Sequence, residues 1–278
     1  MPKQPVLIDV ELSNLDSLPC CGIKNPMHPG VIAKRRWIKA HLKLGLKAKI
    51  LIDDDGKPCG YIESIPGEYA WRNVNACGYL FIHCIWNHSK HNRDQGWGSA
   101  MVRACLRDAK AAGMNGVAVM TREGPWSAGA ALFDASGFKL VDTAPPDCQL
   151  WVRKLKPRAA NPSFKSYSEN AGRLATRLKD KLTIITSAQC PYVVKFTAEI
   201  RQAAQQLYSI EPRMIELKSH SDAQNAPTPY AVFSVLSKGK VLTDHPISRT
   251  RFCNIMRSLE APARRNRTYG FNTSRSSS

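Results

Sequence analysis

A long apolar segment followed by an amphipathic helix constrains this chain more than any other feature. Residues 78–86 are nearly all apolar or aromatic, which predicts a strand buried on both faces of a sheet. After the polar loop 87–95, apolar residues recur at helical spacing over 96–112, and Gly113 follows as a helix stop. A central strand with a helix packed on it favours a mixed α/β (α+β) fold over an all-helical or all-strand one.

The turn between that strand and helix predicts an anion site. It reads RDQGWGS, with Arg93, Gly96 and Gly98 at the start of the helix and Lys90 nearby. The first backbone N–H groups of a helix are unpaired and carry the positive end of the helix dipole. Glycines leave such amides accessible to a pyrophosphate. The turn lacks both the Gly-Lys-Ser/Thr of a Walker loop and the GxGxxG of a dinucleotide site.

Alternation of apolar residues, helical spacing and turn residues predict the other elements. We expect Asp53 to Lys57 to form a hairpin turn, Ser127 to cap a helix, and Gly137 to end that helix. The expected strands of the first unit are 6–12, 48–52, 60–65, 78–86, 117–120, 138–142 and 149–152, and its first helix is 31–44.

The length of 278 residues predicts two domains. We expect a first domain over 1–156, a proline-containing linker over 157–162, a smaller domain over 163–260 and a basic disordered tail over 261–278. The expected elements of the second domain are helices at 174–180, 193–208 and 250–259 and strands at 182–186, 213–217, 231–236 and 240–243.

At Arg93, Gly96 and Gly98 the sequence resembles the GNAT superfamily, the Gcn5-related N-acetyltransferases. Their signature is Arg/Gln-x-x-Gly-x-Gly/Ala at the start of the helix that binds the CoA pyrophosphate, and the resemblance runs from about Val6 to Leu155. It implies a mixed central sheet flanked by helices and acetyl transfer from acetyl-CoA to an amine of unknown identity. The cofactor-binding residues that it implies are Cys84, Ile85, Trp86, Arg93, Asp94, Gln95, Gly96, Trp97, Gly98, Ser99 and Phe133.

The resemblance leaves the catalytic groups open. Phe133 stands where many family members have a tyrosine that protonates the CoA thiolate, so the acid must be Tyr69, Tyr79 or solvent. A backbone N–H near Ile85 could stabilise the oxyanion. The candidate bases are His83, His88, His91 and Glu63, although a histidine in an apolar strand is more often a core residue. Cys84 is interpreted as a buried thiol rather than a nucleophile.

Cys190 lies between a predicted strand and a long helix, where the helix N-terminus would stabilise a thiolate. Its surroundings resemble the thioredoxin-like fold, although Val193 replaces the second cysteine of the redox motif. That resemblance implies a cis-proline in the segment 227–230. The C-terminal stretch also looks like the YoaP-like domain of some bacterial GNAT proteins. An inert thiol and a functional thiol at Cys190 both remain open.

Composition narrows the remaining function classes. No signal peptide and no apolar run of about 18 residues is present, so we expect a cytoplasmic protein without a membrane partner. Nine cysteines without a CxxC pair predict neither a disulfide framework nor a metal site. The net charge of +18 suits an anionic cofactor, solubility or a nucleic acid, of which the last is not favoured. The alternatives to an acetyltransferase are thus a thiol or redox protein centred on Cys190 with a CoA-binding first domain, and a basic nucleic-acid-binding protein. The sequence does not indicate an oligomeric state.

Overall fold

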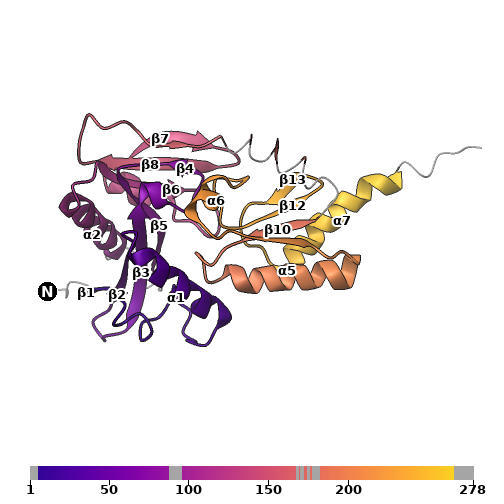
Figure 1. Cartoon of the computed structure of the whole chain (residues 1–278), viewed down its shortest axis with the longest axis horizontal. Helices are drawn as coiled ribbons and strands as arrows, with labels where there is room; N and C mark the ends of the chain where they lie inside the picture. Colours follow the sequence, from indigo (N-terminus) through magenta and orange to yellow (C-terminus); the bar gives the residue numbers. More distant parts are fainter. Residues whose placement is uncertain are drawn as a thin grey trace, which may run out of the picture.

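A computed structural model describes residues 6–87, 96–166, 169, 172, 173, 176 and 182–265. In this part of the chain the larger sheet has seven strands in the order β1-β2-β3-β5-β6-β8-β7 (Figure 1). All neighbours are antiparallel except β5 and β6, which run parallel. The strands are β1 (Val6–Asp9), β2 (Lys47–Ile52), β3 (Pro58–Pro66), β5 (Tyr79–Asn87), β6 (Gly116–Thr121), β7 (Lys139–Ala144) and β8 (Cys148–Lys154).

The central strand β5 is buried on both faces, as the sequence predicts. Leu80 and Ile82 belong to a core formed with α2 (Trp97–Ala111) and α3 (Ala130–Ala135). Tyr79 and Phe81 face the opposite core, which includes residues of α1 (Pro29–Leu42). A short helix η1 (Gly67–Tyr69) and strand β4 (Val74–Asn75) separate β3 from β5. The mixed sheet flanked by helices is therefore confirmed.

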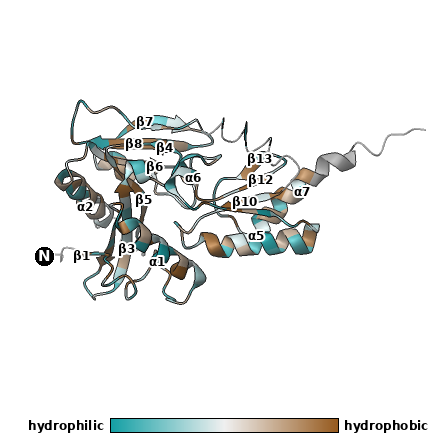
Figure 2. Ribbon diagram, viewed as in Figure 1, coloured by the Kyte–Doolittle hydropathy of each residue, from teal (hydrophilic) through white to brown (hydrophobic). Residues whose placement is uncertain are grey.

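The second unit has its own sheet, in the order β11-β10-β12-β13. Strand β10 is parallel to β11 and antiparallel to β12, and β12 is antiparallel to β13. The elements are β10 (Thr183–Thr186), α5 (Val193–Tyr208), β11 (Arg213–Glu216), α6 (His220–Gln224), β12 (Ser234–Ser237), β13 (Lys240–Thr243) and α7 (Arg249–Arg265). Helix α5 alternates hydrophilic and hydrophobic stretches (Figure 2). This element order is the one expected of a thioredoxin-like domain, and that assignment stays a prediction.

The two units share one hydrophobic core rather than meeting through a free linker. Buried residues of α1, β2 and β5 cluster with buried residues of β10, α5, β12 and α7. The described part of the linker also binds the first unit, because Tyr79 Oη donates to the Ala160 carbonyl and β9 (Ser163–Phe164) pairs with β4. The predicted second domain begins at residue 163, but the strand that starts there pairs with a strand of the first unit. The boundary between the domains stays a prediction.

Several sequence expectations need correction. Ser127 does not cap α3, whose N-cap is Gly129 without a side-chain bond. Helix α7 continues to Arg265, into the first residues of the predicted disordered tail. Strand β12 begins at Ser234, three residues later than expected, and α6 was not predicted although Ser219 and Asp222 form a capping box at its start. Among the described residues the cis peptide is Pro145–Pro146, so a cis-proline within 227–230 is wrong.

Candidate active site

The two parallel strands separate halfway along their length. Strand β5 pairs with β6 only from Tyr79 to Ile82, although it continues to Asn87. The pairing of β5 with β3 also shifts here, since Glu63 lies opposite Cys84 and Ser64 opposite Ile82. His83 is therefore the extra residue of a β-bulge. Beyond Ile82, the edge of β5 that faces β6 has no ladder partner on that strand.

A cavity of about 450 Å³ occupies the space between the separated strands. Its first wall is Ile82 to Trp86 of β5, which includes the predicted cofactor residues Cys84, Ile85 and Trp86. The second wall is formed by β6 and the loop Pro125 to Ala128. Sequence reasoning missed the third wall, which belongs to the second unit and consists of Gln189, Cys190, Pro191, Tyr192 and Tyr230.

Among the described residues, no side chain covers Gly96 at the start of α2. Gly96 is the N-cap in the left-handed conformation (φ 73°), makes no side-chain cap, and would meet nothing within 4 Å if it carried a Cβ. Gly98 has another role, because a Cβ there would lie 3.1 Å from Leu132 Cδ1 of α3. Gly96 thus keeps the helix N-terminus accessible, while Gly98 allows α2 and α3 to pack closely.

The remaining predicted cofactor residues are placed as follows. Trp97 packs partly buried against the core beneath α2. Ser99 lines a separate depression beside Arg103 and Arg153. Residues His88, His91, Arg93, Asp94 and Gln95 lie outside the described residues.

Phe133 does not line the main cavity. It is fully buried and packs edge-to-face on Phe138, with ring centres 5.3 Å apart. Phe133 was predicted to contact the cofactor, but the structure places it in the core beneath α2. The candidate acids Tyr69 and Tyr79 do not line this cavity either, and the tyrosines on its wall are Tyr192 and Tyr230. Burial raises the pKa of Tyr192 to about 12 and also raises the pKa of Tyr230.

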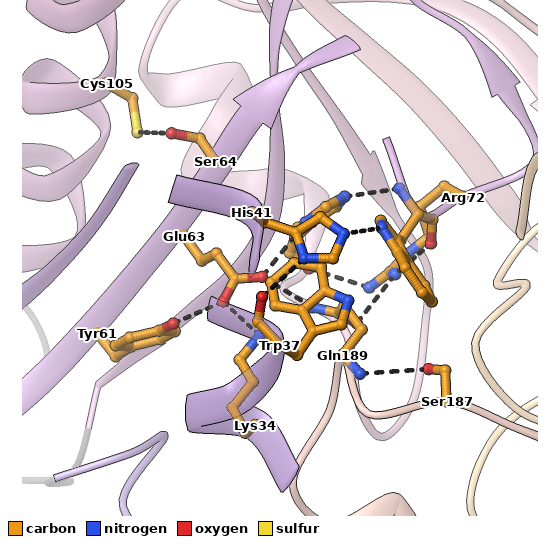
Figure 3. Close-up of polar contacts among 12 residues, drawn as sticks. Lys34, Trp37, His41, Tyr61, Glu63, Ser64, Arg72, Cys105, Ser187 and Gln189 are labelled. Carbon is orange, nitrogen blue, oxygen red and sulfur yellow. Dashed lines mark hydrogen bonds and ion pairs between the residues drawn. The ribbon is translucent and has the colours of Figure 1, made fainter. Parts of the chain in front are cut away.

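Glu63 is the centre of a buried polar network (Figure 3). Its carboxylate pairs with Lys34 Nζ at 2.5 Å and accepts hydrogen bonds from Tyr61 Oη at 2.6 Å and Gln189 Nε2 at 2.9 Å. His83 Nδ1 lies 3.2 Å from the same carboxylate. Burial alone would raise the pKa of Glu63, but the charge of Lys34 and the His83 hydrogen bond outweigh it and hold that pKa well below its usual value.

Both nitrogens of His83 are engaged in this network. Its Nε2 accepts a hydrogen bond from the Trp71 backbone N–H at 2.8 Å, so its Nδ1 carries the proton that is donated to Glu63. Burial lowers the pKa of His83 to about 4, although Glu63 opposes that shift. Both side chains are 0% exposed, and neither has a free lone pair directed at the cavity. Glu63 and His83 are therefore engaged with each other and with their neighbours in this structure, and their assignment as bases stays a prediction.

Cys190 lies in the cavity wall, where its environment favours the inert thiol of the two alternatives that the sequence left open. Removal from water raises the pKa of this thiol to about 11, despite the opposing backbone hydrogen bond at Tyr192. Cys84 and Cys21 line the same cavity. The thiol of Cys21 forms hydrogen bonds with the thiols of Cys84 and Cys20. Among the described residues, no group of histidine, cysteine and acidic side chains is arranged to hold a metal ion.

Trp126 fixes the loop that forms the second wall. Its backbone is left-handed (φ 72°), which is rare for a bulky residue. Its Nε1 donates to the Pro246 carbonyl at 2.8 Å, and its ring contacts those of Tyr192 and Phe196. The second unit thus holds the loop in place.

No helix in the described part of the chain is long and apolar enough to cross a membrane.

Two family models match separate parts of the chain. Residues 23–138 match the acetyltransferase (GNAT) family, and residues 213–254 match the YoaP-like family. The chain is 27% identical over 264 residues to the uncharacterized N-acetyltransferase YoaP of Bacillus subtilis (strain 168), an alignment that covers 91% of this chain and 98% of that relative.

Two solved structures are similar to part of the chain. The structure of yncA from Salmonella typhimurium, which contains acetyl-CoA, is 15% identical, with 56% of this chain and 96% of that one covered and a TM-score of 0.42. YhbS of Escherichia coli in complex with CoA is 14% identical, with 58% and 89% covered and a TM-score of 0.39. The chain thus contains a region that matches the acetyltransferase (GNAT) family and a later region that matches the YoaP-like family, in the order found in a relative of similar length.

Proposed function

We propose that this protein transfers an acetyl group from acetyl-CoA to a primary or secondary amine in the cavity between β5, β6 and the second unit. The observation that carries the proposal is the separation of β5 from β6 beyond Ile82, because it leaves a strand edge without a ladder partner on β6, and β5 packs against α2, whose N-cap is a glycine. A diphosphate would bind the amides at Gly96, and an extended arm would lie along Cys84 to Trp86. Acetyl-CoA supplies an activated thioester at the inner end of that arm.

The residues of the cavity suit direct transfer to an amine. The backbone N–H groups on the open edge of β5, near the bulge at His83, can stabilise negative charge on the carbonyl oxygen. Tyr230 stays protonated at neutral pH and can donate a proton to a departing thiolate, whereas the Tyr192 hydroxyl donates to the Cys21 carbonyl. The described lining contains no carboxylate. We therefore propose that the amine proton leaves through water.

Calorimetric titration with acetyl-CoA tests the binding site. Gly96→Asp places a carboxylate beside the proposed diphosphate, and Gly96→Asn is its uncharged counterpart of the same size. Both residue types tolerate left-handed backbone better than most. Repulsion between like charges should weaken the affinity of the aspartate variant by about tenfold or more relative to the asparagine variant.

Gly113→Asp provides the control for backbone strain. Gly113 follows the C-terminus of the same helix, is also left-handed (φ 64°) and would also meet nothing within 4 Å. This variant should bind acetyl-CoA like the parent protein. Equal affinities for the two Gly96 variants would exclude the diphosphate from this helix end.

A further inference from the structure

Arg72 is a buried cation without an acidic partner in the described part of the chain. It is 5% exposed and lines the cavity. One terminal nitrogen donates to the Trp71 carbonyl at 2.7 Å and to Gln189 Oε1 at 3.2 Å, and the other donates to the His83 carbonyl at 3.1 Å. These acceptors are neutral, and they use three of the five N–H groups of a guanidinium. The guanidinium carbon lies 4.8 Å from the centre of the Tyr230 ring.

The buried charges around Arg72 do not balance. Lys34 and Glu63 form an ion pair that cancels, and His83 shares its proton with Glu63 as a neutral ring. Arg72 therefore leaves one net positive charge beside the cavity (Figure 3). A charge removed from water is costly unless an opposite charge accompanies it.

Arg122 shows how the chain treats a comparable residue. It is 7% exposed and also joins the two units. Its guanidinium pairs with Asp244 at 2.9 Å and Asp147 at 2.8 Å. The protein thus supplies two carboxylates to Arg122 and, among the described residues, none to Arg72. This contrast indicates that the counter-ion of Arg72 is part of a ligand.

The rest of the cavity limits what that ligand can be. Its described lining contains no Asp or Glu, so a polycationic acceptor such as a polyamine or an aminoglycoside would find no opposite charge there. Trp86, Trp126, Tyr192 and Tyr230 give the cavity a largely aromatic surface. A ligand with one carboxylate and an apolar body fits these properties.

We propose that Arg72 binds the carboxylate of the acceptor, and that the acceptor is an amino acid with an apolar or aromatic side chain. This inference rests on the proposed acetyltransferase function. Arg72 comes from the loop after η1, whereas the aromatic surface comes mainly from the second unit and the loop at Trp126. The second unit would then serve as part of the acceptor pocket.

The test compares acceptors that differ only at the carboxylate. Leucine, methionine, phenylalanine and tryptophan are each compared with their amides and their decarboxylated amines, and CoA release is measured on the parent protein. A charged hydrogen bond of ordinary strength predicts that kcat/KM is about tenfold to a hundredfold higher for the best amino acid than for its two analogues. The amides carry less basic amines, which gives them a larger share of uncharged amine and biases the comparison against the proposal. Amides or decarboxylated amines that react as well as the amino acids, or no reaction in any set, would overturn it.

Variants at the two arginines provide the second measurement. Arg72→Gln should reduce the preference for the carboxylate to about one and leave the affinity for acetyl-CoA unchanged. Arg122→Gln also removes a buried arginine between the units but should keep the preference. If Arg72→Gln does not fold, the acceptor series on the parent protein still decides the question.

Two further measurements distinguish a carboxylate on the acceptor from one on the acyl donor. Malonyl-CoA and succinyl-CoA are offered with the decarboxylated amines, and a preference for these donors over acetyl-CoA would assign Arg72 to the acyl group and overturn the proposal. Calorimetry with acetyl-CoA is run in parallel. Absence of binding would remove the proposed function itself, whereas binding without any carboxylate preference would remove only the present inference.

Discussion

At the scale of single residues, Cys190 shows how position along a helix and burial compete. The residue lies shortly before α5, where the helix dipole favours a thiolate. In the folded protein it forms part of a cavity wall with Pro191 and Tyr192, and loss of water favours the neutral thiol. Desolvation is the larger effect and favours the inert thiol of the two alternatives that the sequence left open.

This balance predicts slow alkylation of Cys190. With a pKa of about 11, only about one molecule in a thousand carries the thiolate at pH 8. Iodoacetamide at pH 8, followed by peptide mass spectrometry, should therefore modify the exposed Cys77 well before Cys190. Labelling of Cys190 should accelerate with pH up to about 11. If Cys190 reacts as fast as Cys77 at pH 8, the thiol-chemistry alternative regains its support.

At the scale of elements, strand β5 is positioned by the network around Glu63. The bulge at His83 lets this residue face Glu63 of β3 and accept the Trp71 N–H. The same network reaches Gln189 of the second unit. We propose that the cofactor lies along the edge of β5 that faces β6. Glu63 and His83, which the sequence suggested as catalytic groups, hold this strand in position through contacts with β3 and Trp71.

Protonation of His83 should make stability sensitive to acid. Its pKa is about 4 in the folded protein and about 6.5 in the unfolded chain, so between these values the unfolded state binds more protons. The free energy of unfolding should therefore fall as pH falls from 6.5 to 4, with a contribution of up to about 3 kcal/mol from this residue. The pKa of Glu63 is lowered, so its own contribution is lost only at more acidic pH.

Urea denaturation at pH 7, 5.5 and 4 measures this effect. Burial also lowers the pKa of His41, which adds a pH dependence of the same sign. His83→Gln isolates the His83 contribution, because glutamine can accept from Trp71 and donate to Glu63 without titrating. The variant should show a smaller loss of stability between pH 6.5 and 4. Identical slopes for variant and parent would mean that His83 titrates normally.

At the scale of the whole molecule, polar groups lock the two units together. Asn73 is fully buried, and its Nδ2 donates to the carbonyls of Gln224 at 2.9 Å and Ala226 at 3.0 Å. Gln224 Nε2 in turn donates to the carbonyls of Glu68 and Ala70. With the shared apolar core, these bonds predict that both units unfold together.

Two spectroscopic probes can test this cooperativity. All six tryptophans lie between residues 37 and 151, so their fluorescence reports mainly on the first unit, with Trp126 also in contact with the second, whereas far-ultraviolet circular dichroism reports on the secondary structure of both. The two urea transitions should coincide. Asn73→Ala leaves two buried carbonyls without a partner and should destabilise both signals by about 2 to 3 kcal/mol. Asn225→Ala is the control, because Asn225 is exposed and its side chain bonds within the second unit to Ser221. Separate transitions would show that the units fold independently.

The local pattern of the sequence determined much of the framework of this protein. Periodicity predicted β5, α2 and α5, and Gly96 and Gly113 marked the ends of α2, because these features depend on residues that are close along the chain. The motif at Gly96 also pointed to the family before any fold was known. Ser127 misled, since its hydroxyl turns toward the Met120 carbonyl instead of capping a helix.

Only the tertiary structure decided which polar residues are available for chemistry. The apolar strand around His83 already favoured a core residue, but Glu63 meets Gln189 across 126 positions and Arg72 meets Gln189 across 117, so no local pattern could reveal these partners. The same packing turns Phe133 inward and brings Tyr192 and Tyr230 to the cavity. Helices and strands follow from neighbours in sequence, whereas burial, charge balance and pKa follow from neighbours in space.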